Sequence, residues 1–135
     1  MTDERTARMC LAAVVEPGHP AIAEAVLNYG AAAVWASVTH PGVDLPLSRR
    51  ARVLMVEELI AATKDLGMRF VVPGDAEWPV GTEDLRACEP VNQLTGEPLG
   101  LWLRGAGDLA ELAAASVAIV GSRASTPYGD TVAAD

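Results

Sequence analysis

The residues best suited to chemistry lie near the end of the sequence, in the stretch SVAIVGSRASTPYGD. Gly121 permits a sharp turn and a close approach of the backbone to a ligand. Ser122 offers a hydroxyl, and Arg123 offers a planar guanidinium that can hold a phosphate through two hydrogen bonds. A helix that starts just after such a turn favours an anion, because its first N–H groups and its dipole both attract negative charge. The pattern therefore indicates a phosphate-binding loop.

Thr126 and Pro127 mark the start of the helix expected after this turn, since threonine caps helices and proline suits the first helical position. The stretch matches neither the dinucleotide-binding glycine pattern nor the P-loop. A plain strand-to-helix turn, whose arginine pairs with a carboxylate, is the alternative. The candidate DNA-phosphate-binding residues are Gly121, Ser122, Arg123, Thr126, Tyr128 and Gly129.

No set of residues in the sequence forms a convincing nucleophile and base. His19 and His40 both lie beside prolines, which favours surface or capping roles. Cys10 and Cys88 lack the spacing of a metal site or a redox pair, and we interpret them as structural thiols. The carboxylate-rich stretches GDAEWP and TEDLRACE contain nothing that fixes an acid/base pair. We therefore predict a protein that is not an enzyme and that uses no metal or cofactor.

Composition limits how nucleic acid can be bound. The 135 residues carry a net charge of −8, half of them are hydrophobic, and 4% are aromatic. This charge excludes a broad basic surface, so any contact with DNA must be local. Arg49, Arg50 and Arg52 form a basic cluster that we interpret as a solvated helix face. The sequence contains no apolar run of membrane-spanning length and no secretory signal, which predicts a cytoplasmic protein without a membrane partner.

The elements expected before residue 67 are helical. Glycine and proline separate segments with apolar residues at helical spacing, and Asp3 and Ser48 are the expected N-caps of the first and last segments. Tyr29 and Trp35 are expected in the core. The apolar face of the last helix is expected to comprise Val53, Val56, Leu59, Ile60 and Thr63. The predicted helices span residues 3–16, 20–29, 31–40 and 48–66, and we interpret residues 1–67 as a compact all-α bundle of SAM-like or helix-hairpin-helix type.

The hydrophobic period changes after residue 67. Alternating or continuous apolar runs predict strands at residues 68–72, 99–103 and 117–120. Short helices are expected between them at 82–88 and 107–116. The continuous apolar run 117–120 is typical of a strand buried on both faces of a parallel sheet. The predicted fold is therefore α+β overall, with a helical unit (1–67) followed by the first part of a truncated Rossmann-like α/β domain (68–135).

Three segments in this order, VVPGDAEWP, LGLWLRG and VAIVGSRASTPYG, resemble the signature of the DNA-processing protein A family (DprA, also called Smf). The resemblance implies a SAM-like helical domain and a Rossmann-like domain that binds single-stranded DNA. It also implies dimerisation and the loading of RecA onto incoming strands during natural transformation. In the family the Gly-Ser-Arg turn lies in the DNA pocket, which corresponds here to Gly121, Ser122 and Arg123, and its aromatic-glycine pair corresponds to Tyr128 and Gly129.

Members of that family continue well beyond this point, with further strands and a second glycine-rich loop that completes the pocket. We therefore expect this chain to be an N-terminal portion, with the homodimer formed by residues beyond it, and we expect the isolated chain to bind single-stranded DNA poorly. The stretch NQLTGEPL is longer than its family counterpart. Two other function classes stay open, a nucleotide-processing Rossmann enzyme of the lysine-decarboxylase-like group and a protein-interaction module built on the helical unit.

Overall fold

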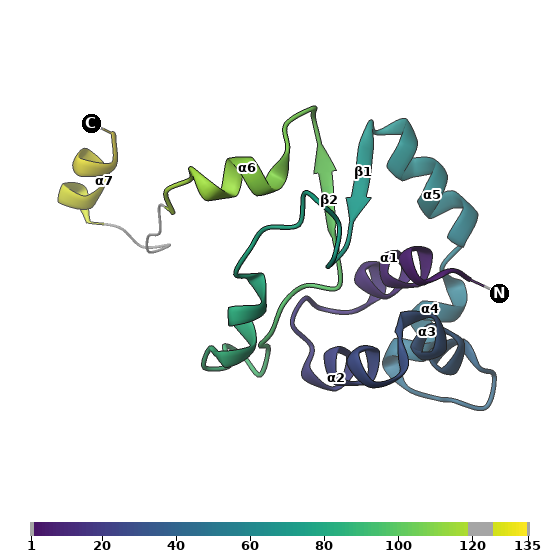
Figure 1. Ribbon diagram of the computed structural model, residues 1–135. Helices are drawn as coiled ribbons and strands as arrows, with labels where there is room; N and C mark the ends of the chain where they lie inside the picture. The colour runs from purple at the N-terminus through teal and green to yellow at the C-terminus, as the bar shows by residue number, and fades with distance from the viewer. Residues whose placement is uncertain (1, 119–125, 135) are drawn as a thin grey trace.

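The computed structural model describes residues 2–118 and 126–134 of the chain (Figure 1). These residues form an α+β fold in which a small antiparallel sheet lies between the helices α5 and α6. The helices before the sheet are α1 (Glu4–Val14), α2 (Pro20–Tyr29), α3 (Ala31–Thr39), α4 (Pro46–Val53) and α5 (Val56–Asp65). The later elements are β1 (Met68–Val71), the 3₁₀ helix η1 (Thr82–Ala87), β2 (Leu101–Arg104), α6 (Leu109–Ala114) and α7 (Pro127–Ala134).

The first helix forms as its sequence predicts. The Thr6 N–H donates to the Asp3 carboxylate at 3.0 Å, which confirms Asp3 as the N-cap. The apolar stripe of α1 is buried against α3, where Trp35 is 6% exposed and belongs to the core as predicted. Residues of α1 in this core are Ala7, Cys10, Leu11 and Val14, and those of α3 are Ala31, Val34, Trp35 and Val38.

A long-range cap joins α1 to the start of α3. The helix α3 begins after Gly30, which has no side chain to cap it. The Glu4 carboxylate takes over this role by accepting hydrogen bonds from the Ala31 and Ala32 N–H groups at 2.8 and 3.0 Å. An acidic group at a helix N-terminus also interacts favourably with the helix dipole. One side chain of α1 therefore completes the start of α3.

The predicted core position of Tyr29 is wrong, because its side chain is 75% exposed. Tyr29 is the last residue of α2, and this helix buries only Val26 fully. The chain turns immediately afterwards at Gly30, whose φ of +80° is in the region that favours glycine. The tyrosine ring therefore remains on the surface.

The predicted helix 48–66 is two helices. Pro46 occupies the first turn of α4, so this helix starts before Ser48, which is not its cap and lies fully buried inside it. Leu54 and Met55 are extended and separate α4 from α5. The break lets Leu54 and Val56 pack against the helical core. Because of this break, the residues expected on one apolar face do not share one: the Val53 and Ile60 side chains are 76% and 43% exposed. Thr63 is buried, as predicted.

The buried Ser48 hydroxyl has no hydrogen-bond partner among the described residues. A buried polar group without a partner destabilises the folded state, so Ser48→Ala should raise the free energy of unfolding by about 1 kcal/mol. The exposed Ser37 of α3 is the matched control. Ser37→Ala should gain only the helix propensity of alanine, at most about 0.5 kcal/mol. Urea unfolding of both variants measures the difference, and equal gains would show that the Ser48 hydroxyl has no such cost.

The sheet pairs β1 with β2 in antiparallel register, with Phe70 opposite Trp102 and their rings 4.7 Å apart. Strands were expected in these two places, as parts of a Rossmann-like α/β domain, and the parallel arrangement suggested for the run 117–120 does not apply to this pair. A parallel pair needs a crossover connection, usually a helix on one face of the sheet, and the chain between β1 and β2 supplies only loops and a 3₁₀ helix before it returns.

The third predicted strand, 117–120, is described by the structure only at its first two residues, and these two are not in a strand. Val117 and Ala118 are outside any strand, and Val117 is 86% exposed, so burial on both faces is wrong for this residue. The rest of that prediction, residues 119–120, lies outside the described residues. The predicted helix 107–116 is the shorter α6, whose N-cap Asp108 accepts a hydrogen bond from the Glu111 N–H at 3.0 Å. The predicted helix 82–88 is η1.

Within the described residues, no single helix has the length and apolar composition to cross a membrane. The pair α2 and α3 meets those two criteria together, but the two helices meet at an angle of 120°. Of this pair, α3 supplies four residues to the protein core.

Candidate functional site

The helix predicted after the glycine turn is present as α7. Thr126 precedes it, and its hydroxyl oxygen accepts a hydrogen bond from the Gly129 N–H at 3.2 Å. The Asp130 N–H donates to the Thr126 carbonyl at 3.0 Å, which closes the first turn. The capping role of Thr126 and the first-turn position of Pro127 are therefore confirmed.

The structure brings three of the six candidate residues into one helical turn and leaves the others undescribed. Thr126, Tyr128 and Gly129 lie at the start of α7, and the Tyr128 side chain is 79% exposed. Gly121, Ser122 and Arg123 lie outside the described residues. Their phosphate-binding role stays a prediction.

The start of α7 offers little to an anion by itself. Pro127 has no N–H, and the Gly129 N–H is used by the Thr126 hydroxyl. Of the first three residues of α7, only Tyr128 then has a backbone N–H that could donate to an anion without breaking the Thr126 cap. Asp130 places a carboxylate in the same turn, and a negative charge there weakens the attraction of the helix dipole for a second anion. Any strong phosphate contact here has to come from a cationic side chain.

The carboxylates of the GDAEWP stretch are held by arginines. Arg5 of α1 makes a bidentate ion pair with Asp75, with N–O distances of 2.6 and 2.7 Å. The same guanidinium donates to the Phe70 carbonyl at 3.0 Å, and the Val72 N–H donates to Asp75 at 2.9 Å. Asp75 therefore ties the loop after β1 to the first helix. Arg5 and Asp75 are 70 positions apart in the sequence, so no local pattern predicts this pair.

A second bidentate pair, Arg69 with Glu77, joins β1 to the loop that follows it, and Arg69 also reaches the segment after β2. Arg69 contacts the Glu77 carboxylate at 2.8 and 2.6 Å, and it also donates to the Gly105 and Gly107 carbonyls after β2. The hydrogen bonds from Arg69 hold the pKa of Glu77 below its ordinary value. Glu77 is thus an ionised structural partner, and this arrangement gives it no role as a general acid.

The ion pair of Asp75 predicts a specific dependence of stability on pH. The hydrogen bonds from Arg5 are the main cause that lowers the pKa of Asp75 below its ordinary value of 3.8. A carboxyl with a lowered pKa in the folded state stabilises the protein above its unfolded pKa, and this contribution is lost as pH falls through the folded value. Asp75→Asn should therefore lose less stability than the natural protein as pH falls from about 5 to about 2.

Urea unfolding at a series of pH values measures this difference. The matched control is Asp44→Asn, because Asp44 pairs with Arg49 at a site where both side chains are about 70% exposed. Solvent screening makes such a pair weak, so its removal should change the pH dependence less. An acid slope in Asp75→Asn equal to that of the natural protein would contradict a structural role for this ion pair.

The histidines, cysteines and basic cluster have the roles expected of surface and core residues. The His40 Nδ1 accepts a hydrogen bond from the Gly42 N–H at 3.1 Å, and His19 is the exposed N-cap residue of α2. Burial raises the pKa of the Cys10 thiol to about 11, whereas Cys88 is exposed. No group of three metal-ligating side chains comes together among the described residues. Arg49, Arg50 and Arg52 are all exposed on α4, as expected for a solvated helix face, and Arg52 also donates hydrogen bonds to the His40 and Val43 carbonyls.

Comparison with known proteins gives one relationship. The chain is 41% identical over 71 residues to proteins from two strains of Mycobacterium tuberculosis, each named "Putative DNA processing protein DprA". The matched region covers 51% of this chain and 18% of each relative, so it spans less than a fifth of their length. No protein-family model matches the chain, and no solved structure matches it.

Proposed function

We propose that this protein is a DNA-processing protein of the DprA type that binds single-stranded DNA. The observation that carries the proposal is the 41% identity over 71 residues to two proteins bearing that name. The three ordered segments described above, which resemble the DprA signature, support the same conclusion from the sequence. The proposal includes a SAM-like helical unit over residues 1–67, a Rossmann-like domain from residue 68 and a cytoplasmic location.

The proposed contact with DNA joins the glycine turn to the first turn of α7. Arg123 donates two hydrogen bonds to a phosphate, and Gly121 and Ser122 allow the backbone to approach it. The exposed ring of Tyr128 supplies a face on which a base can stack. Such a contact needs no broad basic surface, which agrees with a net charge of −8. Loading of RecA and homodimerisation belong to the same proposal and rest on the resemblance to the DprA family.

A stacking role for Tyr128 predicts that Tyr128→Ala weakens binding of single-stranded DNA about tenfold, because one stacked base contributes about 1–3 kcal/mol. Tyr29→Ala is the matched control, since Tyr29 is equally exposed, at 75%, but lies at the end of α2. Fluorescence anisotropy of a labelled oligo-dT gives the affinities of the two full-length variants and of the natural protein. Equal affinities for the two variants would remove Tyr128 from the proposed interface.

The experiment that tests the function as a whole compares DNA binding with nucleotide turnover. The full-length protein should bind oligo-dT with an affinity that falls as salt is added, because phosphate contacts release counterions. A panel of mononucleotides should neither compete well nor be hydrolysed. Release of free base or phosphate at rates well above background, abolished by Arg123→Ala, would contradict the proposal and favour a nucleotide-processing enzyme.

A further inference from the structure

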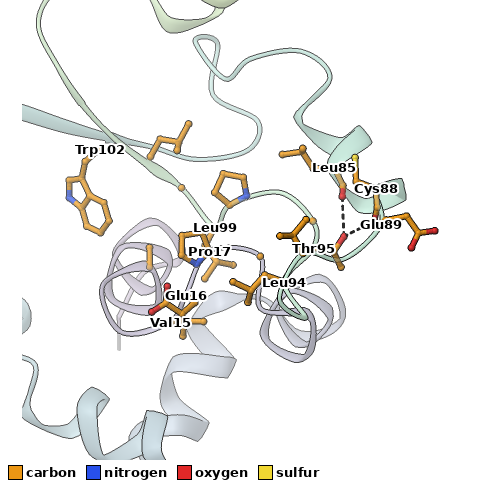
Figure 2. Close-up of a pocket in the computed structure, with 17 residues that line it drawn as sticks. Val15, Glu16, Pro17, Leu85, Cys88, Glu89, Leu94, Thr95, Leu99 and Trp102 are labelled. Carbon is orange, nitrogen blue, oxygen red and sulfur yellow. Dashed lines mark hydrogen bonds between the residues drawn. The ribbon is translucent and has the colours of Figure 1, made fainter. Parts of the chain in front are cut away.

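An apolar cavity of about 570 Å³ lies between the end of α1 and the chain that leads into β2 (Figure 2). Its size is within the range of pockets that bind ligands or anchor side chains. Two regions far apart in the sequence form its walls. One is residues 12–18, at the end of α1 and after it, and the other is residues 85–102, which run from η1 through the turn 91–96 into β2. The three candidate DNA-binding residues that the structure describes, Thr126, Tyr128 and Gly129, do not line it.

The charged side chains that line this pocket have one sign, and the nearby Arg8 and Arg86 are paired with Glu4 and Glu97. Glu16 and Glu89 are the charged residues among those that line it, and none of its described lining residues is lysine, arginine or histidine. Both glutamates are exposed, and Figure 2 shows the Glu89 carboxylate at the outer edge, directed away from the apolar side chains. The pocket therefore repels anions such as DNA and favours an occupant with positive charge beside its apolar part.

Two polar side-chain groups that line the pocket, the Thr95 hydroxyl and the Trp102 indole N–H, already make hydrogen bonds within the protein. The Thr95 hydroxyl lies 3.2 and 3.1 Å from the Leu85 and Cys88 carbonyl oxygens (Figure 2), and the Trp102 indole N–H donates to the Thr63 hydroxyl at 3.1 Å. Small-molecule sites use a few free polar groups to fix the orientation of the ligand. Because these are already used here, a polypeptide is the better occupant, since its backbone orients the apolar side chain that enters the pocket.

The turn at one wall extends the apolar surface beyond the pocket. Val91 and Leu94 pair across a tight turn in which Asn92 and Gln93 have φ of +52° and +65°, a conformation that is unfavourable for non-glycine residues. Val91 lines the pocket, and its side chain is nevertheless 71% exposed to solvent. An apolar residue next to a pocket offers contact area to the neighbours of an anchoring side chain.

We propose that this pocket docks a basic segment of a partner protein, with one or two apolar side chains in the cavity and flanking Lys or Arg residues beside Glu16 and Glu89. This interaction differs from the proposed DNA contact, because its charge preference is opposite and its lining contains none of the described DNA-contact residues Thr126, Tyr128 and Gly129. Cys88, which lines the pocket and is exposed, reports on its occupancy. Cys10 is an internal control, because it is fully buried and its thiol pKa is raised to about 11.

The test measures the rate at which N-ethylmaleimide modifies Cys88 in the full-length protein, followed by mass spectrometry. The probe is the peptide Lys-Arg-Leu-Phe-Leu-Arg-Lys with blocked ends. At ten times its Kd it should slow the modification of Cys88 about tenfold, because only the free pocket reacts. Two matched peptides, Glu-Glu-Leu-Phe-Leu-Glu-Glu and Lys-Arg-Ser-Ser-Ser-Arg-Lys, should give little protection, because one carries the wrong charge and the other lacks the apolar anchor.

Charge reversal supplies the second arm. Glu16→Lys combined with Glu89→Lys should reverse the preference between the basic and the acidic peptide, and both positions are exposed, so the fold should be retained. The control pair Glu58→Lys and Asp65→Lys makes the same change in net charge on α5, outside the pocket, and should keep the original preference.

Three results would overturn the proposal. The first is equal protection by all three peptides, or by none. The second is protection by benzyltrimethylammonium as strong as that by the basic peptide, which would indicate a small-molecule site. The third is an unreactive Cys88 in the full-length protein without peptide, which would show that another part of the chain already covers the pocket.

Discussion

Gly100→Ala should destabilise the protein by about 2–3 kcal/mol, as expected for overpacking a buried site. Gly100 is buried at the approach to β2, and a Cβ at this position would lie 2.2 Å from Cζ of Phe70 and 2.9 Å from the Val71 carbonyl oxygen. The Phe70 ring cannot move away easily, because it is 6% exposed and packs against Trp102. The Val71 carbonyl belongs to the backbone of β1, which is fixed by its pairing with β2.

A second substitution tests this explanation directly. Phe70→Leu removes the atoms that the new methyl group would meet, so the double variant Phe70→Leu with Gly100→Ala should be destabilised by less than the sum of the two single variants. Urea unfolding of the three variants gives the coupling free energy. A sum that is simply additive would show that the close approach of Gly100 to Phe70 is not what makes glycine necessary here.

The local features of the fold were predictable from the sequence. Asp3 as a cap, the buried stripe of α1 and the start of α7 at Pro127 each depend on residues within one or two helical turns. For such features, side-chain chemistry and spacing decide the structure without help from the rest of the chain.

The features that were missed depend on contacts between distant residues. The cap of α3 comes from Glu4, 27 residues earlier, and the partner of Arg5 is 70 residues away. The break between α4 and α5 has no glycine or proline to mark it, and is explained only by the packing of Leu54 and Val56 on the core. A periodic pattern cannot show such contacts, because it contains no information on which surfaces meet.

The same division applies to the candidate site: its local features were predicted from the sequence, and its long-range contacts were not. The residues that form the first turn of α7 were correctly placed, since their roles are local. The carboxylates of the GDAEWP stretch had no assigned role, and the structure gives Asp75 and Glu77 structural ones through Arg5 and Arg69. Because Asp75 and Glu77 have structural roles, the glycine turn and the exposed Tyr128 remain the candidate residues for binding DNA.

The second large effect is expected at Arg123, which carries the central proposal that this turn binds single-stranded DNA. Loss of a bidentate arginine–phosphate contact should weaken binding about tenfold or more, because each hydrogen bond to a charged group contributes about 1.5–3 kcal/mol. The thermal stability of the DNA-free protein should change little, because the proposed partner of Arg123 is a phosphate of the bound DNA. The salt dependence should also become shallower, because one fewer phosphate is neutralised.

The most direct measurement is the affinity of the full-length Arg123→Ala protein for a labelled oligo-dT, measured by fluorescence anisotropy beside Arg49→Ala. The control removes the same charge from an exposed arginine that pairs with Asp44 on the helical unit. The proposal predicts that Arg123→Ala binds about tenfold more weakly or worse, while Arg49→Ala binds like the natural protein. Equal affinities for Arg123→Ala and the natural protein, at equal thermal stability, would contradict it.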